Sequence, residues 1–302
     1  MSTGYSGNLG FTLPENWAYD QISTITLGSG DGLIEIDNNI QSGLDSGASS
    51  VDESYTKPTN LDDYYLYESQ KSDLIKEVSN CVEELMELYQ DLKSVRSPED
   101  AANLVYDNDK VITNLSNKYK IRKALIQTVF MWEASAEGID DTASDAAVVS
   151  YYTYMEALEE WQNLSPEEQL IVTMPTPPVI IKTDSSTGYC QIFASTAISA
   201  YNYAIDNNII SGDKYNYDDW HDVWNVWSNL HNDPEYCISM CALVLIHAAH
   251  LVGLDTDYYG YSTAEIKKVI ARYNGTGDAA ASYGERNYAI YEIFEKYNKQ
   301  VR

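Results

Sequence analysis

The stretch ALIQTVFMWEAS, Ala124 to Ser135, predicts a buried helix that ends beside a carboxyl group. Leu125, Val129 and Glu133 follow at steps of four, which places them on nearly one line of a helix. The sequence ASAEG after Glu133 indicates that the helix ends there. Partial withdrawal from water and the negative end of the helix dipole both raise the pKa of such a carboxyl group. Glu133 is therefore a candidate general acid, and the alternative is a helix-end glutamate that leans into water.

The composition describes a chain with enough apolar residues for a packed core and with a strongly acidic surface. Of its 302 residues 44% are hydrophobic, and 46 acidic residues against 19 basic ones give a formal net charge of -27. A surface of this sign repels phosphate backbones and anionic membranes, which argues against nucleic acid as a partner. The 26 tyrosines against 4 phenylalanines suit stacking on sugar rings, and equally a tyrosine-rich core.

Cysteine and histidine do not form the patterns of a disulfide framework or a metal centre. The cysteines are scattered through the chain: Cys81, Cys190, Cys237 and Cys241. Cys237 and His247 share one predicted helix with Cys241 and His250, and a rise of roughly 15 Å separates the first pair. That distance is too large for one zinc ion. We therefore expect buried thiols, no metal and no cofactor.

The most apolar stretch, CISMCALVLIHAAHLVGL from Cys237 to Leu254, is about the minimum length of a membrane span. It carries two histidines and follows the polar sequence HNDPEY, so we expect a core helix and no membrane insertion. The first residues, MSTGYSGNLGFTLPENW, lack the basic region and apolar run of a signal peptide. We expect a protein made in the cytoplasm without a classical signal peptide.

Three parts follow one another along the chain. Residues 1–60, rich in Gly, Ser, Asn and Asp, are predicted to be flexible or irregular, with ISTITL and LIEI as a candidate strand pair. Residues 61–117 are predicted as a helical extension, and residues 118–302 as a mostly helical domain. The fold class we expect is mainly α (α+β), with a small β patch.

Local signals mark several helix ends. Ser97 before Pro98 is typical of a helix start, and Ser262 with Glu265 resembles a capping box. Asn274 followed by glycine is a helix stop. A further helix is expected over residues 144–161, followed by LIVTMPTPPVIIKT, whose three prolines predict two short extended segments around a turn.

Three segments together resemble the lytic transglycosylases and goose-type lysozymes of the lysozyme-like superfamily. DSSTGYCQIFASTAISAYN, residues 184–202, is similar to their Gly-Leu-Met-Gln-Ile…Ser-Thr-Ala segment. ARYNGTGDAAASYGERNYAIYEIFEKYN, residues 271–298, resembles their Ala-Tyr-Asn-Ala-Gly segment with the tyrosine-containing last helix. ALIQTVFMWEAS resembles the helix that ends in their catalytic glutamate. The segments occur in the family's order over residues 118–298.

The resemblance implies a glycan groove over a helical domain and cleavage of the β-1,4 bond between N-acetylmuramic acid and N-acetylglucosamine. Glu133 would protonate the leaving oxygen as general acid/base. Gln191 and the backbone around Gly188 would hold the sugar and face Glu133, and Ile192 would be a further substrate-binding residue.

The same resemblance places Tyr273 and Asn274 along the groove and gives Asp184 a second catalytic role. Lytic transglycosylases need no second carboxylate, because the substrate's own hydroxyl attacks and an anhydro-sugar forms. Goose-type lysozymes position water with aspartates near the glycine-rich loop, a place that Asp184 matches. Both a transglycosylase and a muramidase outcome stay open.

Two departures from the family's pattern leave alternatives. The segment from Glu133 to Gly188 is longer than in the family, and Tyr189-Cys190 stands where the family has Leu-Met. A catalytically inactive lysozyme-fold binding or structural protein is one alternative, and a Cys-dependent hydrolase using Cys190 is another.

The partner implied by the resemblance is the peptidoglycan glycan strand, at the cell wall or in the periplasm. Because no signal peptide is recognised, we expect arrival by export or injection, as for a phage lysin or an antibacterial effector. A delivery apparatus or an inhibitor protein would then be a further partner.

Overall fold

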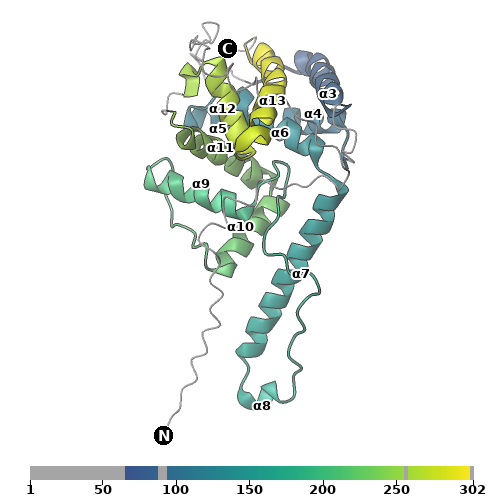
Figure 1. Cartoon of the computed structure of the whole chain (residues 1–302), viewed down its shortest axis with the longest axis vertical. Coiled ribbons are helices and arrows are strands. Elements are labelled where there is room, and N and C mark those ends of the chain that lie inside the picture. Colours follow the sequence, from purple (N-terminus) through teal and green to yellow (C-terminus); the bar gives the residue numbers. More distant parts are fainter. Residues whose placement is uncertain (1–64, 88–93, 255–257, 300–302) are drawn as a thin grey trace.

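The computed structural model describes residues 65–87, 94–254 and 258–299. Its elements in chain order are η1 (Glu68–Gln70), α3 (Lys71–Glu87), α4 (Pro98–Asp107), α5 (Asp109–Tyr119), α6 (Lys123–Ala136), α7 (Ile139–Gln162), α8 (Pro166–Gln169), α9 (Ala194–Asp206), α10 (Trp220–Asn232), α11 (Pro234–Leu251), η2 (Tyr258–Gly260), α12 (Thr263–Tyr273) and α13 (Gly277–Asn298). The described residues are thus mainly helical, as expected (Figure 1).

Regular strands are absent from the described ranges, where pairing is limited to two isolated antiparallel bridges, Ser94 with Gly138 and Thr187 with Ile192. The candidate strand pair ISTITL and LIEI lies outside the described residues. The proline-rich residues 170–183 run back along the molecule without strand pairing. This agrees with three prolines, each of which lacks the N–H that a ladder needs.

The helix ends recognised in the sequence are present. Ser97 Oγ accepts a hydrogen bond from the Asp100 N–H at 3.1 Å and begins α4. The Ser262 N–H donates to Glu265 Oε2 at 2.7 Å, which completes the capping box of α12. Asn274 is the C-cap of α12, so the predicted stop is confirmed.

Helix α11 lies at the centre of the described fold and packs against α5, α6, α9, α10 and α12. Among the described helices it alone is long and apolar enough to cross a membrane by length and composition, and 61% of it is buried inside the structure. The fold therefore uses α11 as its core helix, as the sequence predicted.

The N-terminal helices share this core. Helix α3 packs on α4 and α13, and α4 packs on α6. The predicted boundary between residues 117 and 118 falls inside α5, whose Ile112 is fully buried. The segment expected as an extension is thus continuous with the rest of the helical body.

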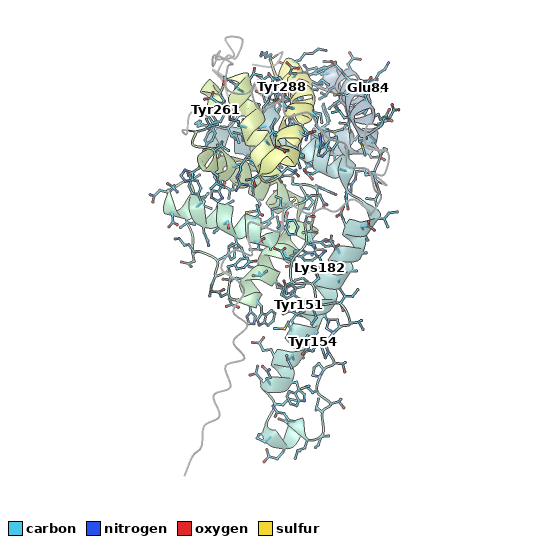
Figure 2. All side chains as sticks on the ribbon, viewed as in Figure 1. Glu84, Tyr151, Tyr154, Lys182, Tyr261 and Tyr288 are labelled. Atoms are coloured by element: carbon cyan, nitrogen blue, oxygen red, sulfur yellow. The ribbon has the colours of Figure 1, made fainter. Side chains whose placement is uncertain are left out.

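Helices α7 and α8 and the returning residues 170–183 form an arm that extends away from the body (Figure 1). Tyr151, Tyr154 and Lys182 lie along this arm (Figure 2). Its base is fixed by Tyr152, whose ring stacks on that of Trp224 of α10 at 4.9 Å. This arm makes up most of the segment between Glu133 and Gly188.

Candidate active site

Glu133 occupies the last turn of α6, above a fully buried apolar line. Leu125 and Val129 are wholly buried, whereas the Glu133 side chain is half-buried. The Glu137 N–H donates to the Glu133 carbonyl at 3.0 Å, and the helix ends at Ala136. The sequence placed both the helix and its end correctly.

The carboxyl group of Glu133 meets α13, which packs closely on α6. The Tyr283 hydroxyl donates to Glu133 Oε1 at 2.5 Å. Arg286 lies one turn further along, with its guanidinium 4.6 Å from the ring centroid of Trp132 and 5.2 Å from that of Tyr283. Helix α13 therefore supplies a hydroxyl donor and a cation beside the acid.

These surroundings raise the pKa of Glu133 to about 7. Burial is the main cause, the hydrogen bond from Tyr283 and the charge of Arg286 oppose it, and Asp141 adds to it. The direction is the one expected from the sequence. A carboxyl group with this pKa is present in both its protonated and its ionised form near neutral pH, which general acid/base chemistry requires.

Arg96 holds the C-terminal end of α6. Its Nη1 donates to the Ala134 carbonyl at 2.9 Å and to Glu137 Oε2 at 2.7 Å. The guanidinium also lies 5.3 Å from the ring centroid of Tyr189, which stacks on Phe130. A cation at this place stabilises the free carbonyls of the helix end.

Residues 187–192 form a tight turn, closed by the Ile192 N–H donating to the Thr187 carbonyl at 3.1 Å. Gly188 has φ +68°, and a Cβ there would lie 2.2 Å from the Leu230 carbonyl oxygen and 2.8 Å from Cys237 Sγ. Contact with α10 and α11 thus requires this glycine. Packing alone therefore explains why a glycine stands at this position, without a glycan that approaches its backbone.

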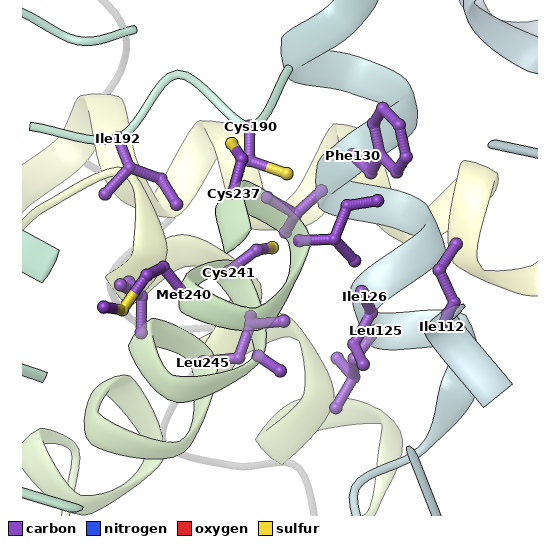
Figure 3. Close-up of a cluster of buried hydrophobic side chains, with 14 of the residues drawn as sticks. Ile112, Leu125, Ile126, Phe130, Cys190, Ile192, Cys237, Met240, Cys241 and Leu245 are labelled. Carbon is purple, nitrogen blue, oxygen red and sulfur yellow. The ribbon is translucent and has the colours of Figure 1, made fainter. Parts of the chain in front are cut away.

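Gln191 and Ile192 also differ from the expected arrangement. The Gln191 Nε2 donates to the Gly188 carbonyl at 3.0 Å, so its amide group is used within the turn. The Ile192 side chain is 2% exposed and lies in the core (Figure 3), where it cannot contact a sugar. Its burial argues against direct binding of substrate by the Ile192 side chain.

Tyr273 connects α12 to this turn. Its hydroxyl donates to the Cys190 carbonyl at 2.7 Å. Burial raises the pKa of Tyr273 well above its usual value, and Cys241, Cys190 and Glu133 raise it further. Tyr273 thus lies among the groups around the acid. Asn274, which follows it, is half-buried.

Asp184 is used as a cap for α9. Its Oδ1 accepts from the Ala194 N–H at 2.9 Å, and its Oδ2 accepts from the Ser195 N–H at 3.0 Å. Burial raises its pKa to about 6, and these amide hydrogen bonds oppose the rise. With both oxygens bonded to the backbone of α9, the geometry argues against the water-positioning role that the resemblance implied.

Cys190 is fully buried beside Cys237 and Cys241 (Figure 3). Burial raises the pKa of its thiol well above the usual value, and the two neighbouring thiols add to this effect. The two histidines that share α11 with Cys237 and Cys241, His247 and His250, stack on the ring of Tyr203. A buried, protonated thiol is a poor nucleophile, so the structure disfavours the Cys-dependent hydrolase.

A polar network that the sequence did not reveal fixes the base of the arm to the turn. Asp145 of α7 accepts hydrogen bonds from the hydroxyls of Ser185 and Thr187, each at 2.8 Å. The Thr187 hydroxyl also lies 2.8 Å from His231 Nδ1 of α10. These residues are distant in sequence, and no local pattern brings them together.

Comparison with known proteins finds similarity over a short segment of the chain. No family model and no solved structure matches the chain. The uncharacterized protein FadG of Bacillus subtilis (strain 168) is 69% identical over 51 residues, which are 17% of this chain and 9% of FadG. The uncharacterized protein YbfG of the same strain is 61% identical over 51 residues, which are 17% of this chain and 7% of YbfG. The chain thus covers less than a tenth of either relative.

Proposed function

We propose that the protein is a peptidoglycan-degrading glycosidase that cleaves the β-1,4 bond between N-acetylmuramic acid and N-acetylglucosamine. The observation that carries the proposal is the carboxyl group of Glu133, with a pKa of about 7, held at 2.5 Å by the Tyr283 hydroxyl at the end of a buried helix. The order of the three family-like segments supports the choice of substrate.

In the proposed reaction, protonated Glu133 gives its proton to the glycosidic oxygen as the bond from that oxygen to the muramic acid C1 breaks. The ionised carboxylate then takes a proton from the hydroxyl group that attacks C1. The Tyr283 hydroxyl and the nearby Arg286 cation stabilise the carboxylate between these two steps. The acid is thereby restored.

The use of Asp184 as a helix cap favours the lytic transglycosylase outcome over the muramidase outcome. A water nucleophile is usually oriented by a second carboxylate, and both Asp184 oxygens bind α9 amides. The substrate's own hydroxyl needs no such residue. We place the activity at the cell wall, reached by export or injection, with a delivery apparatus or an inhibitor protein as further partners.

The test is a comparison of soluble products from purified peptidoglycan after incubation with the wild type, Glu133→Gln and Glu160→Gln. Glu160 is an exposed residue of α7, so its variant is the matched loss of one carboxyl group. Mass spectrometry should find anhydro-muropeptides with the wild type and Glu160→Gln and none with Glu133→Gln. Reducing-end products would favour a muramidase.

Two results would contradict the enzyme proposal. Release by Glu133→Gln at the wild-type rate would remove Glu133 from the reaction. Binding of the glycan without release by the wild type would identify a non-enzymatic binding protein.

A further inference from the structure

A small pocket with a mixed polar and apolar lining lies between α9, α11 and α12, and Tyr273, whose hydroxyl contacts the turn, is one of its lining residues. Its volume is about 60 Å³. An apolar cavity that takes a benzene ring measures about 150 Å³. The pocket therefore suits a group of a few atoms and is too small for a whole sugar ring.

The lining offers hydrogen-bond donors and one cation. Its polar residues are Thr196 and Ser199 of α9, His247 of α11 and Arg272 of α12, together with Ser195, whose hydroxyl is hydrogen-bonded to Asp184. Its apolar part includes Val244, Ala248 and Leu251. Burial, followed by the charges of His250 and Arg272, lowers the pKa of His247 to about 4. The imidazole is therefore neutral at pH 7 and offers one N–H and one acceptor nitrogen.

Arg272 is only lightly engaged by the rest of the protein. Its one hydrogen bond within the described residues runs from Nη1 to the Gly275 carbonyl at 3.5 Å, and no described carboxylate lies within ion-pair distance. By contrast, Arg96 pairs with Glu137 at 2.7 Å, and Lys267 pairs with Glu285 at 2.5 Å. Because a guanidinium has five N–H donors, Arg272 has donors left for a ligand.

The geometry points to a carboxylate as the ligand of this pocket, and we propose that it belongs to the peptide stem of the muramic acid unit. A guanidinium binds a planar carboxylate through two parallel hydrogen bonds, and the hydroxyls of α9 supply further donors. Assignment to the stem rests on the proposed function: where the muramic acid carries a stem, its lactyl carboxyl group is part of the amide bond to that stem, so the free carboxylates belong to the stem.

Tyr273 explains how the pocket and the acid serve one substrate. Tyr273 lines the pocket, and its hydroxyl donates to the Cys190 carbonyl. It lies close enough to Glu133 for the charge of that group to raise the pKa of Tyr273. A stem carboxylate held by Arg272 would fix the position of the muramic acid relative to Glu133. The pocket thus acts as a specificity site for glycans that carry stems.

The test measures binding by calorimetry with the full chain carrying Glu133→Gln, which prevents turnover. The ligands are N-acetylmuramyl-dipeptide with a free carboxylate, the same compound with every carboxylate amidated, and free D-glutamate. We expect the free acid to bind at least about tenfold more tightly than the amide, which is a modest value for a charge-assisted pair. Arg272→Gln should remove this difference, and Arg272→Lys should keep part of it.

Lys268→Gln is the matched control, because Lys268 is an exposed cation of the same helix. It should leave the tenfold difference unchanged. Equal binding of acid and amide, a difference that survives Arg272→Gln, or no binding of either ligand would overturn the inference. Binding of D-glutamate as tightly as the muramyl ligand would assign the pocket to a free acid and overturn its assignment to the stem.

The two proposals can fail separately. Cleavage of peptidoglycan without discrimination between acid and amide would leave the proposed function and remove the carboxylate pocket. Discrimination that depends on Arg272 without any cleavage would keep the pocket and remove the enzyme.

Discussion

The end of α6 and the start of α9 each hold a half-buried carboxyl group, and the two groups are used in different ways. Burial raises the pKa of Glu133 to about 7 and that of Asp184 to about 6. Asp184 gives both of its oxygens to backbone amides of α9. Glu133 meets the hydroxyl of Tyr283 and a nearby guanidinium. A raised pKa thus identifies a withdrawn carboxyl group, and the partners decide whether it serves structure or chemistry.

The largest expected effect is a difference in peptidoglycan release between variants of these two carboxyl groups. Glu133→Gln should lower peptidoglycan release by about 10²- to 10⁴-fold, because a general acid contributes that much. Asp184→Asn should lower the free energy of unfolding by about 1–2 kcal/mol, as the loss of a charged helix cap does. Its activity per folded molecule should stay within about threefold of the wild type, measured after correction for the folded fraction. If Asp184→Asn lost as much activity as Glu133→Gln while its stability stayed unchanged, Asp184 would have to be assigned a role in the proposed reaction.

The turn that follows Asp184 provides a test of packing, in which its Gly188 is compared with Gly253, a glycine at positive φ that follows α11. Gly188→Ala should lower the free energy of unfolding by about 3–5 kcal/mol, because strain at φ +68° adds to a clash with the Leu230 carbonyl at 2.2 Å. Gly253→Ala, at φ +74° with no atom within 4 Å, should cost only about 1–2 kcal/mol. Urea denaturation measures both. Equal costs would show that the turn does not pack on α10 as described.

The raised pKa of Glu133 should also appear in the pH dependence of stability. The folded protein keeps this proton up to about pH 7, whereas the unfolded chain releases it near 4.5. The folded state therefore binds more protons in this range, and the stabilisation, complete below pH 4.5, is lost as the pH rises through 7. Glu133→Gln lacks this titration. Its free energy of unfolding minus that of the wild type should therefore be greater at pH 8 than at pH 4, by roughly 2–3 kcal/mol. A difference that does not change with pH would contradict the raised pKa.

The smallest effect concerns the partner of the acid. Tyr283→Phe removes a hydrogen bond that lowers the pKa of Glu133, so the pKa should rise by up to about one unit. The alkaline limb of the pH profile of kcat/KM should then move to higher pH. Tyr291→Phe is a matched loss of one buried tyrosine hydroxyl on α13 and should leave that limb in place. A shift in the opposite direction would show that Tyr283 does not donate to the ionised acid.

Local signals in the sequence were sufficient for much of the fold. The four-residue spacing up to Glu133 and the Ser262–Glu265 capping box depend on neighbours along the chain, and both are present in the structure. The partners of these residues depend on contacts between distant segments. Tyr283 reaches Glu133 across 150 residues, and Asp145 meets Thr187 across 42.

The differences between the predicted substrate contacts and the contacts in the structure have a common physical cause. The resemblance of the motif to a sugar-binding loop predicts substrate contacts for Gly188, Gln191 and Ile192. In the structure the glycine is required by contact with α10, the glutamine closes its own turn and the isoleucine is buried. A motif fixes the shape of a turn, and which side of that turn faces solvent is decided by the elements that pack on it.

The carboxyl resonance of Glu133 gives the most direct measurement of the central claim, that this group holds its proton near neutral pH. Glutamate labelled with ¹³C at the carboxyl carbon would be followed by NMR from pH 3 to 9, and the resonance absent from Glu133→Gln would identify the residue. We predict a midpoint near 7, the value given by its buried position. A midpoint near the ordinary 4.5 would contradict the account, because Glu133 would then be ionised and unable to act as an acid at neutral pH.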